Sequence, residues 1–167
     1  FGPSAEAARL EADKAFAKQL MRQYAIPTAD SRTFVDFESA QQYIATRDEP
    51  VVVKAAGLAK GKGVIVCDDP ADAILAAEKI LAKRIFGDAG ATIVVEERLL
   101  GREVSLLAIV DGHTSYVLEP AQDHKRIGEG DTGPNTGGMG SYCPTPAMTE
   151  ELIAVVAAER ADHRGRT

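Results

Sequence analysis

Residues 51–66 read VVVKAAGLAKGKGVIV, which is two runs of β-branched residues joined by a glycine-rich stretch. Runs of this composition favour β-strands, because branched side chains pack well on a pleated surface. The spacing matches neither a Walker A loop, which needs Ser or Thr after its lysine, nor a GxGxxG turn that opens a helix. We therefore predict two strands of one sheet, joined by a flexible hairpin that can close as a lid.

The polar residues of this stretch suit phosphate binding. Lys54 ends the apolar run at residues 51–53. A charge in this position costs free energy unless a partner, such as a nucleotide phosphate, is supplied. Glycines let backbone N–H groups approach phosphate oxygens, and lysines neutralise their charge. Taken alone, the stretch also fits a solvated basic turn. The candidate phosphate-binding residues are Lys54, Gly57, Gly61, Lys62 and Gly63.

Three helices are indicated on the two sides of this hairpin. Ser4 can cap a helix that continues to about Tyr24. Asp36 can cap a second helix over residues 38–46, and Asp69, followed by a proline at the first helical position, marks the start of a third. The apolar face of the third helix is expected to carry Ile74, Ala77, Leu81 and Ile85.

The remaining segments indicate the fold class. Strand composition recurs at residues 33–35, 92–96, 104–110 and 114–118, and a last helix is expected over residues 148–160. Helices that alternate with short strands joined by tight turns predict an α+β or mixed α/β fold with a chiefly antiparallel sheet. Residues 121–146 have no hydrophobic period and are rich in glycine, so we expect a long functional loop there.

The composition excludes several classes of function. A net charge of -6 argues against sequence-independent binding of nucleic acid, which needs a basic face. Cys67 and Cys143 have no Cys or His at metal-ligand spacing, so we expect neither a zinc site nor a disulfide framework. No apolar run is long enough for a membrane span and no signal peptide is visible, so we expect a cytoplasmic protein. The chain begins at Phe1 without an initiator Met, which suggests a domain of a longer protein.

A second group of polar residues lies at residues 93–105, IVVEERLLGREVS. Adenine is recognised by an acceptor for its amino group and a backbone N–H for a ring nitrogen, and a carboxylate can hold both ribose hydroxyls. Glu96, the backbone near Leu99 and Glu103 can supply these groups. The alternative is a charged hairpin whose acids pair with Arg98 and Arg102.

A third group lies at residues 122–140, QDHKRIGEGDTGPNTGGMG. The stretch combines many donors, acceptors and flexible glycines, which suits a sugar phosphate and a small zwitterion. The alternative is a disordered surface loop, although such a loop rarely carries so many different functional groups between two patterned segments.

These motifs together resemble glycinamide ribonucleotide synthetase, also called phosphoribosylamine-glycine ligase. The resemblance is carried by FGP at residues 1–3, the lysine and glycine stretch 51–66, FGDAG at 86–90, VEERLLGREVS at 95–105, and QDHKR with DTGPNTGGMG within 122–140. It covers the chain to about Arg160. The last motif is specific to this family, whereas the lysine and glutamate patterns recur across ATP-grasp enzymes.

The resemblance implies a truncated ATP-grasp core within an α+β fold. A partial ATP-grasp domain would occupy residues 1–160. Its lid subdomain of antiparallel strands and helices would cover about 28–97, and about 98–160 would begin the second subdomain, with a substrate loop at 121–146. Residues 161–167 would form a frayed tail.

The resemblance also implies roles for individual residues. The ATP-binding residues would be Lys14, Lys54, Gly57, Gly61, Lys62, Gly63, Glu96, Glu97, Leu99 and Glu103. Residues for glycine and 5-phosphoribosylamine would be Asp123, His124, Lys125, Arg126, Asp131, Thr132, Gly133, Asn135, Thr136, Gly137, Gly138 and Met139. Lys125, Arg126, Asp131 and Asn135 would also take part in catalysis.

The implied reaction joins glycine to 5-phosphoribosylamine with ATP and Mg²⁺ (or Mn²⁺), through a glycyl phosphate. The family places its metal ligands, a Glu and an Asn, on later strands that this chain does not reach, so no metal ligand is expected here and the 167 residues alone should be nearly inactive. Two alternatives are a non-catalytic nucleotide-binding module and another ATP-grasp carboxylate-amine ligase. The implied partners are small molecules, and the parent protein would be monomeric or fused to other purine-pathway domains.

Overall fold

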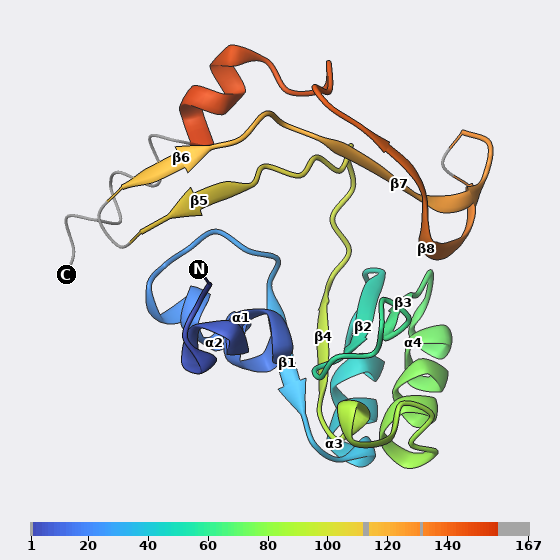
Figure 1. Ribbon diagram of the computed structural model, residues 1–167. Helices are drawn as coiled ribbons and strands as arrows, with labels where there is room; N and C mark the ends of the chain where they lie inside the picture. Colours follow the sequence, from blue (N-terminus) through green and yellow to red (C-terminus); the bar gives the residue numbers. More distant parts are fainter. Residues whose placement is uncertain (1, 112–113, 131, 157–167) are drawn as a thin grey trace. The chain divides into compact units, whose positions relative to one another are not determined.

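The computed structural model describes residues 2–111, 114–130 and 132–156. Asp131 and the tail at 161–167 lie outside the described residues. The chain divides into two compact units, one that ends at Leu99 and one that begins at Leu100 (Figure 1).

The first unit is built on a four-stranded sheet in the order β1-β4-β2-β3. All three strand pairs are antiparallel, as the sequence predicted. The stretch 51–66 forms β2 and β3 with their hairpin, and β2 lies in the middle of the sheet beside β4. The strands are β1 Ser31–Phe34, β2 Val51–Ala55, β3 Val64–Val66 and β4 Ile93–Glu97.

One face of this sheet is covered by α3 (Phe37–Ala45), by α4 (Pro70–Ala77) and by the π-helical turn Glu78–Ala82 that continues α4. The hydrophobic core lies between these helices and alternate residues of β2 and β4. Full burial of each large aliphatic side chain stabilises the fold by about 1.5–3 kcal/mol. The core residues that the strands contribute are Val51, Val53, Ala55, Ile93 and Val95.

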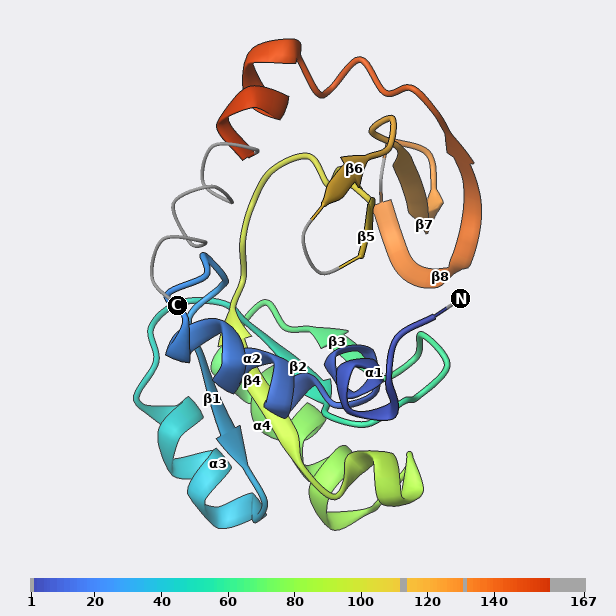
Figure 2. The same ribbon diagram turned by 60° about the vertical axis from the view of Figure 1, so that its left-hand side comes forward.

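The opposite face of the sheet receives α2, Lys14–Gln23 (Figure 2). Sequence analysis predicted one helix from Ser4 to about Tyr24, and this prediction is wrong in one respect. The segment forms α1, Ala5–Ala12, and then α2, because Asp13 between them is extended and its side chain accepts a hydrogen bond of 3.1 Å from Phe16 N. An aspartate competes with the helical backbone and favours such a cap.

The predicted helix caps are confirmed. The side chains of Ser4, Asp36 and Asp69 accept hydrogen bonds from the first turns of α1, α3 and α4. The expected apolar face of the third helix is confirmed for Ile74, Ala77 and Leu81, but not for Ile85. The helix ends before this residue, and Ile85 is 52% exposed.

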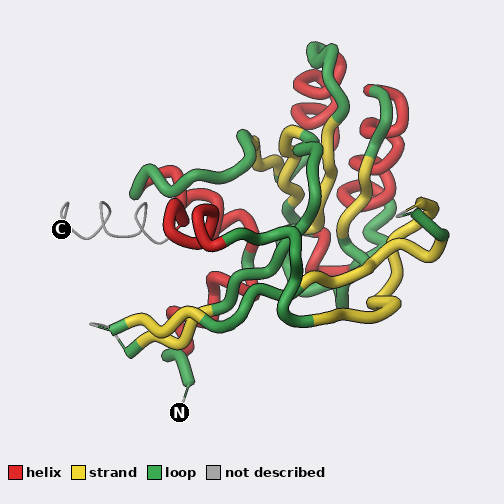
Figure 3. The backbone as a smooth tube through the Cα atoms, turned by 90° about the horizontal axis from the view of Figure 1, so that it is seen from above, coloured by secondary structure: helices red, strands yellow, loops and turns green. Residues whose placement is uncertain are grey.

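The second unit contains two separate two-stranded antiparallel sheets, drawn in yellow in Figure 3. Strands β5 (Ala108–Val110) and β6 (Ser115–Val117) pair with each other, as do β7 (Gln122–Gly128) and β8 (Thr132–Tyr142). The expected strand at 104–110 is thus shorter, with Ser105 forming only an isolated bridge to Ala121. Residues 150–156 form a helix that begins after Thr149.

The long loop expected at residues 121–146 is largely a β-hairpin. It forms without a hydrophobic period because its strands are joined by backbone hydrogen bonds, and most of its described side chains are exposed or half-buried. The register is irregular between His124 and Arg126 and again between Arg126 and Gly128. A bulged ladder of this kind bends the strand and re-aims its side chains.

Candidate functional site

Glu96 is the centre of a charged cluster on the face of the sheet that α2 covers. Its carboxylate is 5% exposed and forms ion pairs with Lys54 of β2 and Lys18 of α2. The Lys18 Nζ to Glu96 Oε2 distance is 2.7 Å. The sequence predicted that the charge of Lys54 needs a partner. Within the protein this partner is the Glu96 carboxylate.

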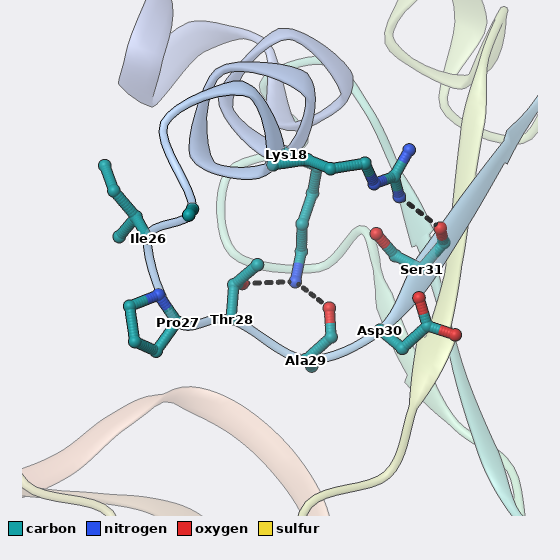
Figure 4. A pocket seen from close by; sticks show the side chains of 9 residues that line it. Lys18, Ile26, Pro27, Thr28, Ala29, Asp30 and Ser31 are labelled. Atoms are coloured by element: carbon teal, nitrogen blue, oxygen red, sulfur yellow. Dashed lines mark hydrogen bonds between the residues drawn. The ribbon is translucent and has the colours of Figure 1, made fainter. Parts of the chain in front are cut away.

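Sequence analysis missed Lys18. Its Nζ donates hydrogen bonds to Thr28 Oγ1 at 2.7 Å and to the Ala29 carbonyl at 2.9 Å (Figure 4). Burial lowers the pKa of Lys18, and the charge of Glu97 opposes this effect. A lysine inside an amphipathic helix carries no sequence signal of such a contact, since its partner is 78 positions away in the sequence.

The pocket in Figure 4 lies beside this cluster, along the connection from α2 to β1. Arg22 donates a hydrogen bond of 2.6 Å to the Ser31 carbonyl, and Asp30 N donates one of 2.9 Å to Glu97 Oε1. The backbone of Glu97 returns a bond of 2.9 Å to the Asp30 carbonyl. These contacts fasten the connection to the end of β4, where the adenosine-binding residues were predicted.

Lys14 and Gly57 are in direct contact. Lys14 Nζ donates to the Gly57 carbonyl at 3.1 Å, and Gly57 N donates to the Ala89 carbonyl at 2.9 Å. A Cβ atom on Gly57 would lie 2.7 Å from Ala89 Cα. This end of the predicted lid is therefore fixed against a neighbouring segment and requires glycine for close approach.

The rest of the lid turns tightly. Lys60 and Gly61 both have positive φ angles, of 51° and 76°, and Lys62 N donates to the Ala59 carbonyl at 3.0 Å. Gly63 is buried, and its carbonyl accepts from Ala55 N at 2.8 Å. The side chains of Lys60 and Lys62 are exposed at the tip, so the lid presents two cations to solvent.

The predicted adenosine residues are divided between the two units. Glu96, Glu97 and Leu99 belong to the first unit, and Leu99 is 69% exposed. Glu103 belongs to the second unit, where it is exposed and forms an ion pair with Lys125. Arg98 pairs with Asp68, which lies outside the 93–105 stretch, and not with an acid of that stretch as the alternative interpretation had it.

Most of the predicted residues for the small substrates lie on β7 and β8. Lys125 Nζ is 3.8 Å from Asp123 Oδ2. The hydrogen bond that Lys125 donates to the Glu103 carboxylate raises the pKa of Lys125. The rings of His124 and Tyr142 stack with centroids 5.6 Å apart. Arg126 is opposite Asn135 in the register.

Thr136 joins the two strands at the irregular part of the ladder. Its hydroxyl donates to the Lys125 carbonyl at 2.8 Å and accepts from Gly138 N at 3.0 Å. The hairpin thus holds Asp123, His124, Lys125 and Arg126 on one strand, with the glycines on the other. Thr132, Gly133, Gly137 and Met139 also lie on β8.

No three His, Cys, Asp or Glu side chains gather as metal ligands do within residues 2–111, 114–130 and 132–156. None of the helices in these ranges is long and apolar enough to cross a membrane.

Residues 12–160 match the family described as phosphoribosylglycinamide synthetase, ATP-grasp (A) domain. The chain belongs to this family. A phosphoribosylamine-glycine ligase of Rhodopirellula baltica is 55% identical, over 93% of this chain and 37% of its own length. The human trifunctional purine biosynthetic protein adenosine-3 is 53% identical, over 92% of this chain and 15% of its own length.

The structure shows the same relationship. The crystal structure of phosphoribosylamine-glycine ligase from Thermotoga maritima superposes with a TM-score of 0.85 at 37% identity, over 95% of this chain and 40% of that one. The predicted α+β ATP-grasp fold of the phosphoribosylglycinamide synthetase family is thereby confirmed. The chain spans about two fifths of the length of the Rhodopirellula baltica and Thermotoga maritima ligases.

Proposed function

We propose that this chain is the nucleotide-binding part of an ATP-dependent ligase that joins glycine to 5-phosphoribosylamine in purine biosynthesis. The observation that carries the proposal is the cluster of Lys54, Lys18 and Glu96 at the centre of a family-typical ATP-grasp sheet. A buried carboxylate beside a lysine at the root of a glycine-rich lid offers an acceptor for a base and a cation for a phosphate.

In this proposal the first unit binds most of the nucleotide. Lys14 and Lys54 contact phosphate oxygens, while Lys62 and the glycines of the lid close over them. Glu96 Oε2 is buried and accepts no hydrogen bond of good geometry from the described residues, which suits it to receive the amino group of adenine. Glu97 and Leu99 contribute their backbone to the base. Glu103 keeps its proposed role toward the ribose hydroxyls on sequence grounds alone.

The β7–β8 hairpin is proposed to bind the small substrates. Lys125 and Arg126 offer charge to the phosphate of 5-phosphoribosylamine, and Asn135 offers an amide to glycine. Thr136, by bonding to both strands, holds these side chains in register. Asp131, predicted for the same pocket, lies outside the described residues and keeps its proposed role on sequence grounds alone.

The proposed reaction has two steps. The glycine carboxylate attacks the γ-phosphorus of ATP and ADP leaves, which gives glycyl phosphate. The amine of 5-phosphoribosylamine then attacks the acyl carbon, phosphate leaves and the new amide loses a proton. Both steps depend on positioning and charge neutralisation rather than on a protein nucleophile.

The family resemblance also implies Mg²⁺ or Mn²⁺, which would supply positive charge to neutralise the reacting phosphates. The described residues do not form a carboxylate cluster that fits such an ion, so we assign it no ligand among them. We further propose a cytoplasmic location and a parent protein that is monomeric or fused to other purine-pathway domains, as the human relative is named for three functions.

Two measurements test the proposal. Isothermal titration of ATP into the 167-residue chain should show binding, which Lys54→Met should weaken more than Lys79→Met, an exposed lysine far from the lid in sequence. In a longer protein that includes this chain, ADP release should require both glycine and 5-phosphoribosylamine. ATP binding with release that is indifferent to glycine would indicate a different ATP-grasp ligase.

A further inference from the structure

Lys18 is held by three oxygens that belong to different parts of the first unit. Thr28 Oγ1, the Ala29 carbonyl and Glu96 Oε2 lie 2.7, 2.9 and 2.7 Å from its Nζ. Burial lowers the pKa of Lys18. The two hydrogen bonds that its Nζ donates and the carboxylate charge 2.7 Å away act against this effect and favour the charged form.

We propose that Lys18 is a positioning residue that keeps Glu96 ionised. The ionised carboxylate then makes the site prefer a purine with an amino group at C6 over one with a carbonyl group at C6. This inference rests on the proposed function, in which Glu96 accepts a hydrogen bond from adenine. Lys18 itself does not touch the nucleotide.

The two lysines beside Glu96 differ in freedom. The side chain of Lys18 is 13% exposed and is tied to the Thr28–Ala29 segment, whereas that of Lys54 is 27% exposed and lies at the root of the lid. When Lys54 turns to a phosphate, Lys18 remains as the cation that compensates the buried carboxylate. Without it, protonation of Glu96 would relieve the burial of an unpaired charge.

Glu96 Oε2 is a buried acceptor that receives no hydrogen bond of good geometry from the described residues. Lys18 is nevertheless close to this oxygen. Lys18 therefore acts on Oε2 chiefly through its charge. A buried acceptor left in this way is suited to a donor from outside, such as an exocyclic amino group.

The other neighbours of Glu96 do not replace this charge. Its register partners are Ser31 on β1 and Val52 on β2, which are uncharged. Arg22, on the same helix as Lys18, donates to the Ser31 carbonyl, and Asp30 and Glu97 bond to each other at the strand end. Lys18 and Lys54 are thus the cations that the structure pairs with Glu96.

Ionisation of Glu96 decides which base it prefers. An ionised carboxylate only accepts hydrogen bonds, so it favours the C6 amino group of adenine and repels the C6 carbonyl of hypoxanthine. A protonated carboxyl group can donate to that carbonyl, and the discrimination shrinks. ATP and ITP differ at this position and form a matched pair of probes.

The test measures the affinities of the 167-residue chain for ATP and ITP. In Lys18→Met we expect the ratio of the two affinities to fall about tenfold, and to recover as the pH rises and Glu96 ionises. Lys18→Arg should keep most of the ratio because it keeps the charge. Lys79→Met should leave it unchanged. Equal weakening of ATP and ITP in Lys18→Met would overturn the inference.

A second readout needs no nucleotide. In chain labelled with ¹³C at the glutamate carboxyl carbons, the Glu96 resonance, assigned with Glu96→Gln, should titrate at higher pH in Lys18→Met than in the wild type. An unchanged titration contradicts the inference even where ATP binds. If the Glu96 titration shifts but the chain binds no nucleotide, the proposed function is contradicted. The effect of Lys18 on the ionisation of Glu96 is then still supported.

A substitution with a smaller expected effect serves as a second test. Should Lys18→Met not fold, Thr28→Val is the second variant. It removes one oxygen that holds the Lys18 ammonium beside Glu96, so the charge remains but is less firmly placed. We expect a smaller fall in the ATP-to-ITP ratio, about threefold, together with a smaller shift of the Glu96 titration. No change in either quantity in a folded Thr28→Val chain counts against the inference.

Discussion

Lys54 and Glu96 are diagonal neighbours on one face of the central sheet. The register pairs Val52 with Glu96 and Lys54 with Val94, so the two charged side chains point the same way from adjacent antiparallel strands and form an ion pair. In the proposed function one of them binds a phosphate and the other a base. The ion pair thus joins two groups that, in the proposed function, the nucleotide would separate.

Lys54→Met should therefore affect both stability and binding. Removing one partner of a buried carboxylate is expected to lower the free energy of unfolding by about 1–3 kcal/mol, with Lys18 limiting the loss. ATP affinity should fall about tenfold or more, since a phosphate loses its cation. Urea denaturation and isothermal titration measure the two effects. Lys79→Met is the control, and equal behaviour of the two variants would contradict the assignment.

Gly57→Ala and Gly61→Ala should destabilise the fold for different reasons. At Gly57 the new Cβ would lie 2.7 Å from Ala89 Cα, so two hydrogen-bonded segments must separate, at about 1–3 kcal/mol. At Gly61 the Cβ meets nothing within 4 Å, and only the positive φ of 76° is unfavourable, at about 1 kcal/mol.

The urea midpoints of the two alanine variants measure this difference in stability. Gly57→Ala probes one end of the lid and Gly61→Ala probes its tip. Gly57→Ala should also displace the carbonyl that accepts from Lys14, and so weaken ATP binding more than Gly61→Ala does. The reverse order of stabilities would show that Gly57 is not tightly packed against Ala89.

Cys67 should be unreactive in the folded chain. Burial raises the pKa of its thiol to about 11 from 9.0, with the charge of Asp72 as the next cause. Near pH 8, a thiol reagent should modify the exposed Cys143 quickly and Cys67 only after unfolding. The variant Cys143→Ser should remove the fast phase. A fast phase that persists in this variant would mean that Cys67 is accessible.

The same shift gives a pH dependence of known sign. The folded-state pKa of Cys67 lies above its unfolded value, so the native chain holds the proton more tightly between about pH 9 and 11. The stability that this group contributes is complete below this window and falls as the pH rises through it. The free energy of unfolding of wild type minus that of Cys67→Ala should therefore decrease from pH 9 to pH 11.

The sequence predicts those features of the fold that depend on neighbouring residues. The caps at Ser4, Asp36 and Asp69 each act within one helical turn, and the structure confirms all three. The break between α1 and α2 at Asp13 was missed because the helical spacing of apolar residues continues across it. Asp13 is the one residue there whose type favours a cap over a helix interior. Local pattern and local capping compete at such a position.

The charged cluster could be predicted only in part. The position of Lys54 at the end of an apolar run demanded a partner, and that inference needed no structure. The identity of the partner depends on the register between β2 and β4, and the contribution of Lys18 depends on the placement of α2. Neither relationship leaves a periodic signal in the sequence.

Gly138 should be more sensitive to substitution than its neighbour Gly137, although both lie in β8. Gly138 has a φ of 120°, which an alanine adopts only with strain, whereas a Cβ on Gly137 would meet nothing within 4 Å. The strain is about 1–3 kcal/mol. Since an isolated two-stranded hairpin is only marginally stable, this is enough to open it. Gly138→Ala should therefore open the β7–β8 pair.

Amide hydrogen exchange of the 167-residue chain measures this opening. We expect exchange in β7 and β8 to become about tenfold faster or more in Gly138→Ala and to change little in Gly137→Ala, while β2 and β4 of the first unit stay protected in both. Loss of protection in both units would mean that they unfold together. Equal exchange in the two variants would mean that the bond from Gly138 N to Thr136 does not hold the hairpin in register.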